Sequence, residues 1–312
     1  MADSQPRTGG LMYRLPLVFL LAFTALWFPD IQLDQILQGG SAAPVRAGCN
    51  LKVVSWNIER GLQFEAVKAA LEKMKPEVVL LQEVDLNAQR TGRLNIAGQL
   101  ADSLGMNYYF AREFEELGQG SRKDPAYHGQ AVLTALPVYS TRIIRFKNQT
   151  GFWKPRWFIP NWGMFQRRTG GRIAFVTELQ AGSRKVVIYN VHLESRNSER
   201  LRLSQIEQVI EDAARYPADT PILIAGDLNT RQENPPAVEA LLRSNFRRAV
   251  GREITTSEGK ALDWMFVRGP LNFTQGKVHR EIRASDHFPL SVNLETGVSG
   301  CAETGSGAGR VQ

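Results

Sequence analysis

The sequence is poor in the residues on which several common kinds of site depend. It holds two cysteines and four histidines in 312 residues. Two cysteines exclude a disulfide-dense scaffold and a cysteine-rich zinc module. There is also no glycine-rich phosphate loop, no nucleophile elbow and no Cys/His spacing for zinc. Any histidine chemistry must therefore use a short set of residues: His128, His192, His279 and His287.

The apolar run near the N-terminus is too short for an ordinary transmembrane helix. It covers residues 15–28 without a charge, whereas a full span needs roughly 20 residues. It follows Arg7 and Arg14, and a positive flank before a short apolar run is typical of a secretory signal. We therefore expect residues 1–47 to be a signal peptide or membrane anchor with a linker. The protein would be exported (periplasmic or secreted) or membrane-anchored, and a buried helix of the domain is the alternative.

The rest of the composition indicates a folded chain with a basic surface. Apolar residues make up 43% and charged residues 22% of the sequence, which excludes a wholly disordered protein. Lys and Arg outnumber Asp and Glu by 38 to 31, and the net charge is +7. This balance favours an anionic partner, whether nucleic acid, an acidic membrane surface or a phosphorylated small molecule.

Strand and helix patterns alternate from residue 51 onward. Apolar residues recur at helical spacing in residues 64–74, 96–104, 201–213 and 237–244. Short apolar runs predict strands at residues 51–56, 78–82, 131–133, 173–179, 185–192, 222–225, 264–267 and 290–294. Because the middle of the chain shows strands without helices, the pattern favours a mixed sheet or a two-sheet sandwich flanked by helices. We expect the domain to cover residues 48–296 and a flexible tail to follow over 297–312.

Polar residues that could carry chemistry lie at the ends of these strands. They are Asn57, Glu83, His192, Asp227, Asn229, Asp263, Asp286 and His287. Strand ends are where a rigid scaffold presents functional side chains. Carboxylates and an amide suit a hard cation such as Mg²⁺, and two histidines can transfer protons near neutral pH. Taken singly, each residue also fits a plainer role, such as a turn asparagine, a solvated glutamate or a core histidine.

The order of these segments resembles that of the endonuclease/exonuclease/phosphatase superfamily, which has the deoxyribonuclease I-like fold. Six segments carry the resemblance: 55–58 (SWNI), 81–84 (LQEV), 189–193 (YNVHL), 225–229 (AGDLN), 262–264 (LDW) and 285–289 (SDHFP). The resemblance implies an α/β fold, a four-layer α/β sandwich in which two mixed β-sheets pack face to face with helices outside. It also implies a metal-dependent phosphoric ester hydrolase.

The resemblance implies a metal site. Glu83 would be the principal ligand of Mg²⁺, with Mn²⁺ and Ca²⁺ as alternatives. Asn57 would help to hold the metal and the phosphate, and Asp286 would close the site beside them.

The resemblance also implies catalytic roles. Asp227 and Asn229 would orient the attacking water and the phosphoryl oxygens. His287 would act as general base or phosphate contact, and Asp263 would hydrogen-bond it and favour its charged form. His192 matches the histidine that assists the leaving oxygen in the deoxyribonuclease I and sphingomyelinase branches. The choice of general base stays open.

The segment 145–172 is rich in aromatic and basic residues. Three of the six tryptophans lie in it, Trp153, Trp157 and Trp162, together with cations such as Arg156. The segment could be an insertion packed on its own aromatics, a membrane-contacting surface or a nucleic-acid contact. We predict that Arg156, Trp157 and Trp162 bind substrate.

Two departures from the family pattern lie near His128. Gln130 stands where relatives commonly have Asn, and Ala135 stands where they often have Arg. Neither removes a core catalytic residue, but both could alter contacts to phosphate or substrate. His128 itself is a further candidate for the site.

Three functions fit these observations. The leading one is an exported Mg²⁺-dependent phosphodiesterase or phosphatase, most of all a nuclease-type hydrolase. A sphingomyelinase-like lipid phosphodiesterase at a membrane surface is the second, and a non-catalytic binding module is the third. The expected partner is a phosphoester substrate, either nucleic acid or phospholipid, and we expect a monomer.

The two cysteines flank the domain. Cys49 precedes the first strand and Cys301 follows the last, and in the family these two strands are antiparallel neighbours. An exported protein could therefore carry a Cys49–Cys301 disulfide. A lipidated Cys49 and two free thiols are the alternatives.

Overall fold

The computed structural model describes residues 33–45, 48, 50–150, 164–165, 167–182, 184–196, 198–274 and 276–295. Residues 1–32 of the expected signal, anchor and linker segment 1–47, the C-terminal tail, both cysteines and the predicted substrate-binding residues Arg156, Trp157 and Trp162 lie outside the described residues. Within the expected linker, residues 36–39 form a strand that pairs with residues 108–111, so the folded part begins before residue 48. Within the described ranges, no helix is long and apolar enough to cross a membrane.

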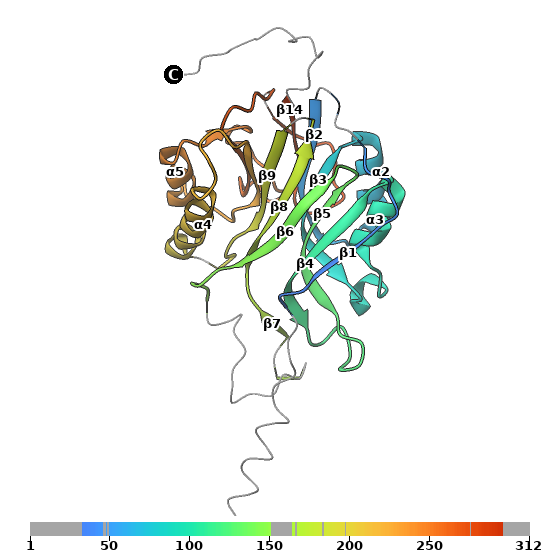
Figure 1. Ribbon diagram of the computed structural model, residues 1–312. Helices are drawn as coiled ribbons and strands as arrows, with labels where there is room; N and C mark the ends of the chain where they lie inside the picture. The colour runs from blue at the N-terminus through green and yellow to red at the C-terminus, as the bar shows by residue number, and fades with distance from the viewer. Residues whose placement is uncertain are drawn as a thin grey trace, which may run out of the picture.

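Two mixed β-sheets form the centre of the molecule (Figure 1). The first has eight strands in the order β1–β4–β5–β3–β2–β14–β13, with β7 paired to β4. Its strands are β1 (Ile36–Gly39), β2 (Asn50–Arg60), β3 (Val78–Leu86), β4 (Asn107–Glu116), β5 (Tyr127–Thr134), β7 (Arg168–Gly170), β13 (Lys277–Val278) and β14 (Leu290–Glu295). Its central pair, β2 and β3, is parallel, whereas the other pairs are antiparallel.

The second sheet has six strands in the order β11–β12–β10–β9–β8–β6. They are β6 (Val138–Arg145), β8 (Ile173–Ala181), β9 (Arg184–His192), β10 (Ile222–Asp227), β11 (Arg247–Arg248) and β12 (Asp263–Arg268). Here β9 and β10 are the parallel pair. Each sheet therefore has one parallel pair at its centre, and in both cases the carboxyl ends of that pair carry predicted site residues.

Helices cover the outer faces of the two sheets (Figure 1). Helices α2 (Phe64–Met74) and α3 (Ile96–Leu104) pack on the first sheet, and α4 (Glu199–Ala213) and α5 (Pro236–Arg243) pack on the second. A short 3₁₀ turn, η1 (Gln89–Thr91), precedes α3. Apolar side chains of both sheets, among them Leu80 of β3 and Ile188 of β9, form the core between them. The predicted four-layer sandwich is confirmed.

Local signals explain the helices, and a bulge explains one strand that the sequence pattern missed. Asn95 caps α3 by accepting a hydrogen bond from the Gly98 amide, and Gly105 ends the helix in a left-handed conformation, as its residue type favours. Strand β4 was not predicted. Its register shifts at Glu113, between Arg112 and Phe114, and a bulge of this kind breaks the alternation by which a strand is recognised.

Strands β2 and β14, which are closest to the two cysteines in the sequence, are antiparallel neighbours. Asn50 at the start of β2 pairs with Glu295 at the end of β14, and Ser55 pairs with Leu290. The pairing that motivated a Cys49–Cys301 bridge is therefore present. The two cysteines lie outside the described residues, so the disulfide stays a prediction.

Gly226 in β10 is required by its backbone, and this yields a test of the fold. Its φ is +141°, and a Cβ placed there would lie 2.0 Å from the Val191 carbonyl oxygen of β9. We expect Gly226→Ala to lower the free energy of unfolding by about 3 kcal/mol or more, because backbone strain and steric overlap add.

Gly105→Ala is the matched control for this prediction. Gly105 also has a positive φ, +65°, but nothing lies within 4 Å of its added Cβ. Gly105→Ala should lower the free energy of unfolding by about 1–2 kcal/mol, because only the left-handed conformation is unfavourable for alanine there. Urea unfolding of both variants measures the difference, and equal losses would contradict the close approach of β9 and β10.

Candidate active site

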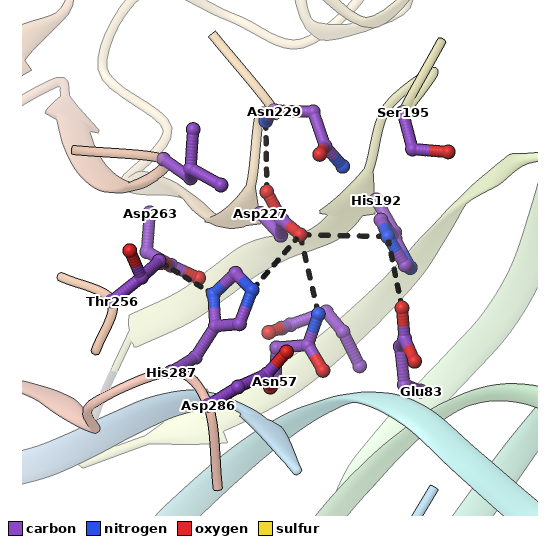
Figure 2. A network of polar contacts seen from close by, with 12 residues as sticks. Asn57, Glu83, His192, Ser195, Asp227, Asn229, Thr256, Asp263, Asp286 and His287 are labelled. Carbon is purple, nitrogen blue, oxygen red and sulfur yellow. Dashed lines mark hydrogen bonds and ion pairs between the residues drawn. The ribbon is translucent and has the colours of Figure 1, made fainter. Parts of the chain in front are cut away.

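The predicted site residues converge because strands of both sheets end at the same edge (Figure 2). In the second sheet, Asp227 is paired in register with His192 on one side and with Asp263 on the other. The three side chains therefore belong to one row across β9, β10 and β12. Asn57 of β2 and Glu83 of β3 face them from the first sheet, and the loop before β14 adds Asp286 and His287 (Figure 2).

Asp227 lies at the centre of the polar network (Figure 2). Its Oδ2 accepts a hydrogen bond from Asn57 Nδ2 at 3.2 Å and lies 3.5 Å from His192 Nε2 and 3.9 Å from His287 Nε2. Its Oδ1 accepts a hydrogen bond from the Asn229 amide at 2.8 Å. Burial, with a smaller contribution from the neighbouring Asp263, raises the pKa of Asp227 to about 7. A carboxylate with such a pKa can accept a proton near neutral pH.

The turn after β10 supports this carboxylate. Asn229 has a left-handed φ of 51°, which asparagine tolerates better than most residues. The hydrogen bond from its backbone N–H to Asp227 Oδ1 closes an Asx turn, and its side chain donates to the Leu193 carbonyl at 3.3 Å. The same Asx turn therefore also places the Asn229 side chain in the site.

His287 is held in one orientation by Asp263. Its Nδ1 lies 2.8 Å from Asp263 Oδ2, which also accepts a hydrogen bond from the Thr255 hydroxyl at 2.6 Å. The Trp56 indole fixes the backbone by donating to the His287 carbonyl at 2.9 Å. Burial opposes protonation, but the charges of Asp263 and Asp227 outweigh it and raise the pKa of His287 to about 10. The expected Asp263–His287 contact is present, and the imidazole is charged at neutral pH.

Glu83 presents a carboxylate that is free to bind a cation. The register of the β2–β3 pair shifts between Asn57 and Arg60, and that of the β3–β5 pair shifts between Leu81 and Val84. Glu83 lies at both irregularities, and its φ is 52°. Within the described chain, its nearest charged partners are Arg60 at 3.6 Å and His192 at 3.9 Å, both beyond ordinary hydrogen-bond length.

The charge of Glu83 is stabilised by its surroundings. Burial would raise its pKa, but the neighbouring His128, His192, Arg60 and Arg172 together outweigh burial and lower it. Asn57 lies close to this carboxylate on the neighbouring strand, and Asp286 lies at the exposed edge of the site (Figure 2). These oxygen donors suit a hard divalent cation. A second group, Asp227, Asp263 and His287, has ligand atoms within 4.8 Å of one another and could also hold a metal.

His192 is buried against an arginine that sequence reasoning did not identify. Its Nδ1 lies 2.8 Å from Arg172 Nη1 and 3.6 Å from Glu113 Oε1. Burial first, and then the charge of Arg172, lower the pKa of His192 well below its ordinary value. The pair Gly170–Gly171 directly before Arg172 was the signal available in the sequence, since two glycines permit a close backbone approach.

His128 and Gln130 lie behind the site rather than at its open edge. His128 Nδ1 lies 3.0 Å from Asp85 Oδ1, and Arg90 donates twice to the same carboxylate, at 2.6 and 2.7 Å. Gln130 donates to Glu113 Oε1 at 2.8 Å. The glutamine found in place of the family's asparagine therefore supports the carboxylate that pairs with Arg172.

The fold agrees with what comparisons with known proteins find. A model described as Endonuclease/Exonuclease/phosphatase family matches residues 54–287, a range that includes all eight predicted metal-binding and catalytic residues. No curated protein matches the chain at a significant level.

Solved structures show the same fold at low sequence identity. An endonuclease/exonuclease/phosphatase from Beutenbergia cavernae DSM 12333 is similar over 80% of this chain and 72% of its own, at 17% identity and a TM-score of 0.58. One from Bacteroides vulgatus is similar over 80% and 99%, at 14% identity and a TM-score of 0.57. Truncated Caenorhabditis elegans TDP2 is similar over 80% and 98%, at 22% identity and a TM-score of 0.51. These likenesses show the shared fold. The family model covers most of the chain and establishes that the chain belongs to the endonuclease/exonuclease/phosphatase family, whose members are divalent-metal-dependent phosphoester hydrolases.

Proposed function

We propose that the protein is an exported, Mg²⁺-dependent phosphodiesterase of the nuclease type. The observation that carries the proposal is the meeting of two kinds of group at one edge of the sandwich. Among the described residues, the charged groups nearest the Glu83 carboxylate are Arg60 at 3.6 Å and His192 at 3.9 Å. Asp227 lies between two imidazoles, His192 and His287 (Figure 2). Hydrolysis of a phosphoester needs charge neutralisation, an oriented water and a donor to the leaving oxygen.

The donor set fits the metal that the family uses. Glu83, Asn57 and Asp286 supply carboxylate and amide oxygens, which Mg²⁺ prefers to nitrogen or sulfur. A bound Mg²⁺ would neutralise charge on the phosphoryl group. The Asp263–His287 pair is less suited to this role, because its hydrogen bond of 2.8 Å already occupies the imidazole Nδ1.

The protein's own residues divide the remaining work. Asp227, with its raised pKa, accepts the proton of the attacking water, and Asn229 helps to orient the reacting groups. The charged His287 donates to a phosphoryl oxygen while Asp263 keeps its ring in place. His192 donates a hydrogen bond on the side of the leaving oxygen.

Cations at the rim favour a polyanionic substrate. Arg60 lies 3.6 Å from Glu83 on one side of the site. On the other side, the exposed Arg231 donates to the carbonyl of Ser195 at 2.9 Å. Together with the net charge of +7, this supports nucleic acid as the substrate class. Export is proposed from the basic flank and apolar run at residues 1–28.

A substrate panel with the full chain tests the proposal. It should contain plasmid DNA, RNA, sphingomyelin vesicles, inositol phosphates and bis(p-nitrophenyl) phosphate. We expect the highest kcat/KM on a nucleic acid. Preference for sphingomyelin would favour the lipid-directed alternative, and no hydrolysis of any substrate would favour a binding module.

Hydrolysis should require a divalent cation held by Glu83. Excess chelator should abolish it, and Glu83→Gln should lower kcat by about 10²-fold or more, because a metal contributes several kcal/mol to the transition state. Steady-state rates on the preferred substrate measure both effects. Glu65→Gln on α2, whose side chain is 82% exposed, is the matched control, and equal losses in the two variants would refute the metal assignment.

Both imidazoles should matter to the chemical step. His192→Ala and His287→Ala should each lower kcat by roughly 10²–10⁴-fold, the usual effect of a positioned acid–base or donor group. His279→Ala, on a half-buried histidine bonded to Ser291, is the control and should change kcat little. A loss below about tenfold in both site variants would show that the site is misplaced.

The pH profile should report the charge of His287. Because Asp263 and Asp227 raise its pKa to about 10, kcat/KM should fall above that pH as His287 loses its proton. At the acid side, kcat/KM should fall below about pH 7, where Asp227 becomes protonated and can no longer accept the proton of water. Asp263→Asn removes one stabilising charge, so the alkaline limb should move to lower pH. Asp102→Asn, an exposed carboxylate on α3, should leave the limb in place, and an unchanged limb in Asp263→Asn would contradict the assignment.

A further inference from the structure

The inward-facing nitrogen of His192 has two neighbours of opposite character. Arg172 Nη1 lies 2.8 Å from Nδ1, and Glu113 Oε1 lies 3.6 Å from the same atom. The two neighbours require different protonation states of Nδ1. A carboxylate accepts a hydrogen bond from a protonated Nδ1, whereas a guanidinium can only donate one to an unprotonated Nδ1. The identity of the nearer partner therefore decides which nitrogen of His192 carries hydrogen.

The distances select the arginine. At 2.8 Å the Arg172 contact is a full hydrogen bond, whereas 3.6 Å to Glu113 is too long for one. A guanidinium has no acceptor, so Nδ1 must accept and cannot carry a proton. We propose that Arg172 is a positioning residue that holds His192 as the neutral tautomer with its hydrogen on Nε2. The role in catalysis, though not the tautomer, rests on the proposed phosphodiesterase function.

Arg172 is itself fixed from behind. Its Nη1 also donates to Glu113 Oε2 at 2.9 Å, and the other oxygen of that carboxylate accepts from Gln130 at 2.8 Å. The side chains of Arg172 and Glu113 are 3% and 0% exposed. Gln130, Glu113, Arg172 and His192 thus form a continuous buried chain that runs from β5 through β4 and the start of β8 to the end of β9.

The backbone is shaped to make this chain. Gly170 has a φ of +142°, and a Cβ there would lie 2.1 Å from the Glu113 carbonyl oxygen. The amide of Gly171 donates to that same carbonyl at 2.9 Å. Only a glycine permits so close an approach. It brings Arg172 against Glu113, which the bulge in β4 presents.

The tautomer defines what His192 can do. With hydrogen on Nε2, the ring donates toward the site, where Asp227 Oδ2 lies 3.5 Å away and Glu83 Oε1 3.9 Å away. It cannot take up a proton at Nδ1 without losing Arg172. His192 therefore acts as a fixed hydrogen-bond donor, whereas His287 is the imidazole that carries charge. Two histidines that approach the same oxygen of Asp227 are thus given different tasks by their different partners.

Nitrogen NMR of the ring tests the inference without substrate. The full chain, labelled with ¹⁵N-histidine, should be measured near neutral pH with and without Mg²⁺. With four histidines in the chain, a His192→Gln sample assigns the signals. We expect an unprotonated Nδ1 and a protonated Nε2. A proton on Nδ1, in either a reversed tautomer or a doubly protonated ring, would overturn the proposal.

Variants of Arg172 assign the effect to that residue. In Arg172→Met the remaining neighbour of Nδ1 is Glu113, so Nδ1 should gain a proton and kcat should fall by about 10–100-fold, as when other groups that orient a functional histidine are removed. Arg172→Lys keeps a cationic donor and should keep Nδ1 unprotonated. An unchanged His192 spectrum in Arg172→Met would overturn the proposal.

A direct measurement replaces the methionine variant if that variant does not fold. The ¹⁵N–¹⁵N coupling across the hydrogen bond should connect Arg172 Nη1 to His192 Nδ1 in the wild-type protein, and its absence would refute the contact. Because these readouts need no turnover, they separate the inference from the proposed function. A protein that hydrolyses no phosphoester but shows the coupling retains the tautomer assignment, and an active protein without it loses only that assignment.

Discussion

A buried hydrogen bond between Gln82 and Asn190 joins the two sheets directly beside the site. Gln82 Nε2 donates to Asn190 Oδ1 at 2.7 Å, and Asn190 donates in turn to the carbonyls of Leu81 and Ala131. Both side chains are fully buried. The apolar core around them attracts the sheets without fixing how far one slides over the other, but buried polar groups must find their partners. Gln82 directly precedes Glu83, and Asn190 lies two residues before His192, so this bond fixes the cation ligand relative to the imidazole.

The electrostatics of the site follow from the same close packing. Water is excluded from Asp227, His192 and Asp263, so each ionisable group takes the state that its neighbours permit. Burial raises the pKa of Asp227 above that of an exposed carboxyl, whereas the positive groups around Glu83 lower its pKa and keep it ionised. The sandwich brings the two kinds of carboxylate together by setting Asp227 on one sheet and Glu83 on the other.

Short motifs at strand ends made most of the site predictable from the sequence. The motifs are local, and each predicted metal or catalytic residue lies within a strand or the turn beside it, as with Glu83 in β3 and Asp227 in β10. Helices α2 and α3 were equally accessible, since apolar spacing and a closing glycine or proline are also local. These patterns do not determine which metal is bound or which substrate is cleaved, because similar sets of ligand residues occur in enzymes that act on different phosphoesters.

The supporting residues could not be predicted in this way. Arg172, Glu113 and Asp85 are charged residues in strands or at their ends, where such residues usually face solvent. Their burial makes sense only through partners distant in the sequence, such as Glu113 for Arg172, 59 positions apart. Strand β4 escaped for a related reason, since the bulge that presents Glu113 also disrupts its alternation. The local signal was the pair Gly170–Gly171, which indicates a close backbone approach but does not indicate which segment is approached.

The pairing of β2 with β14 has a mechanical consequence. The pair Asn50–Glu295 lies at the end of these strands that is remote from Asn57, and Ser55–Leu290 lies at the end beside His287. Tension applied at Asn50 and Glu295 themselves would therefore unzip this pair of strands rather than shear it, and the hydrogen bonds would break one after another. Peeling would begin far from the chemistry and would have to pass all six paired positions before it disturbed the His287 loop. Separation of these two strand ends would therefore leave the arrangement around His287 unchanged until the last of the six paired positions had opened.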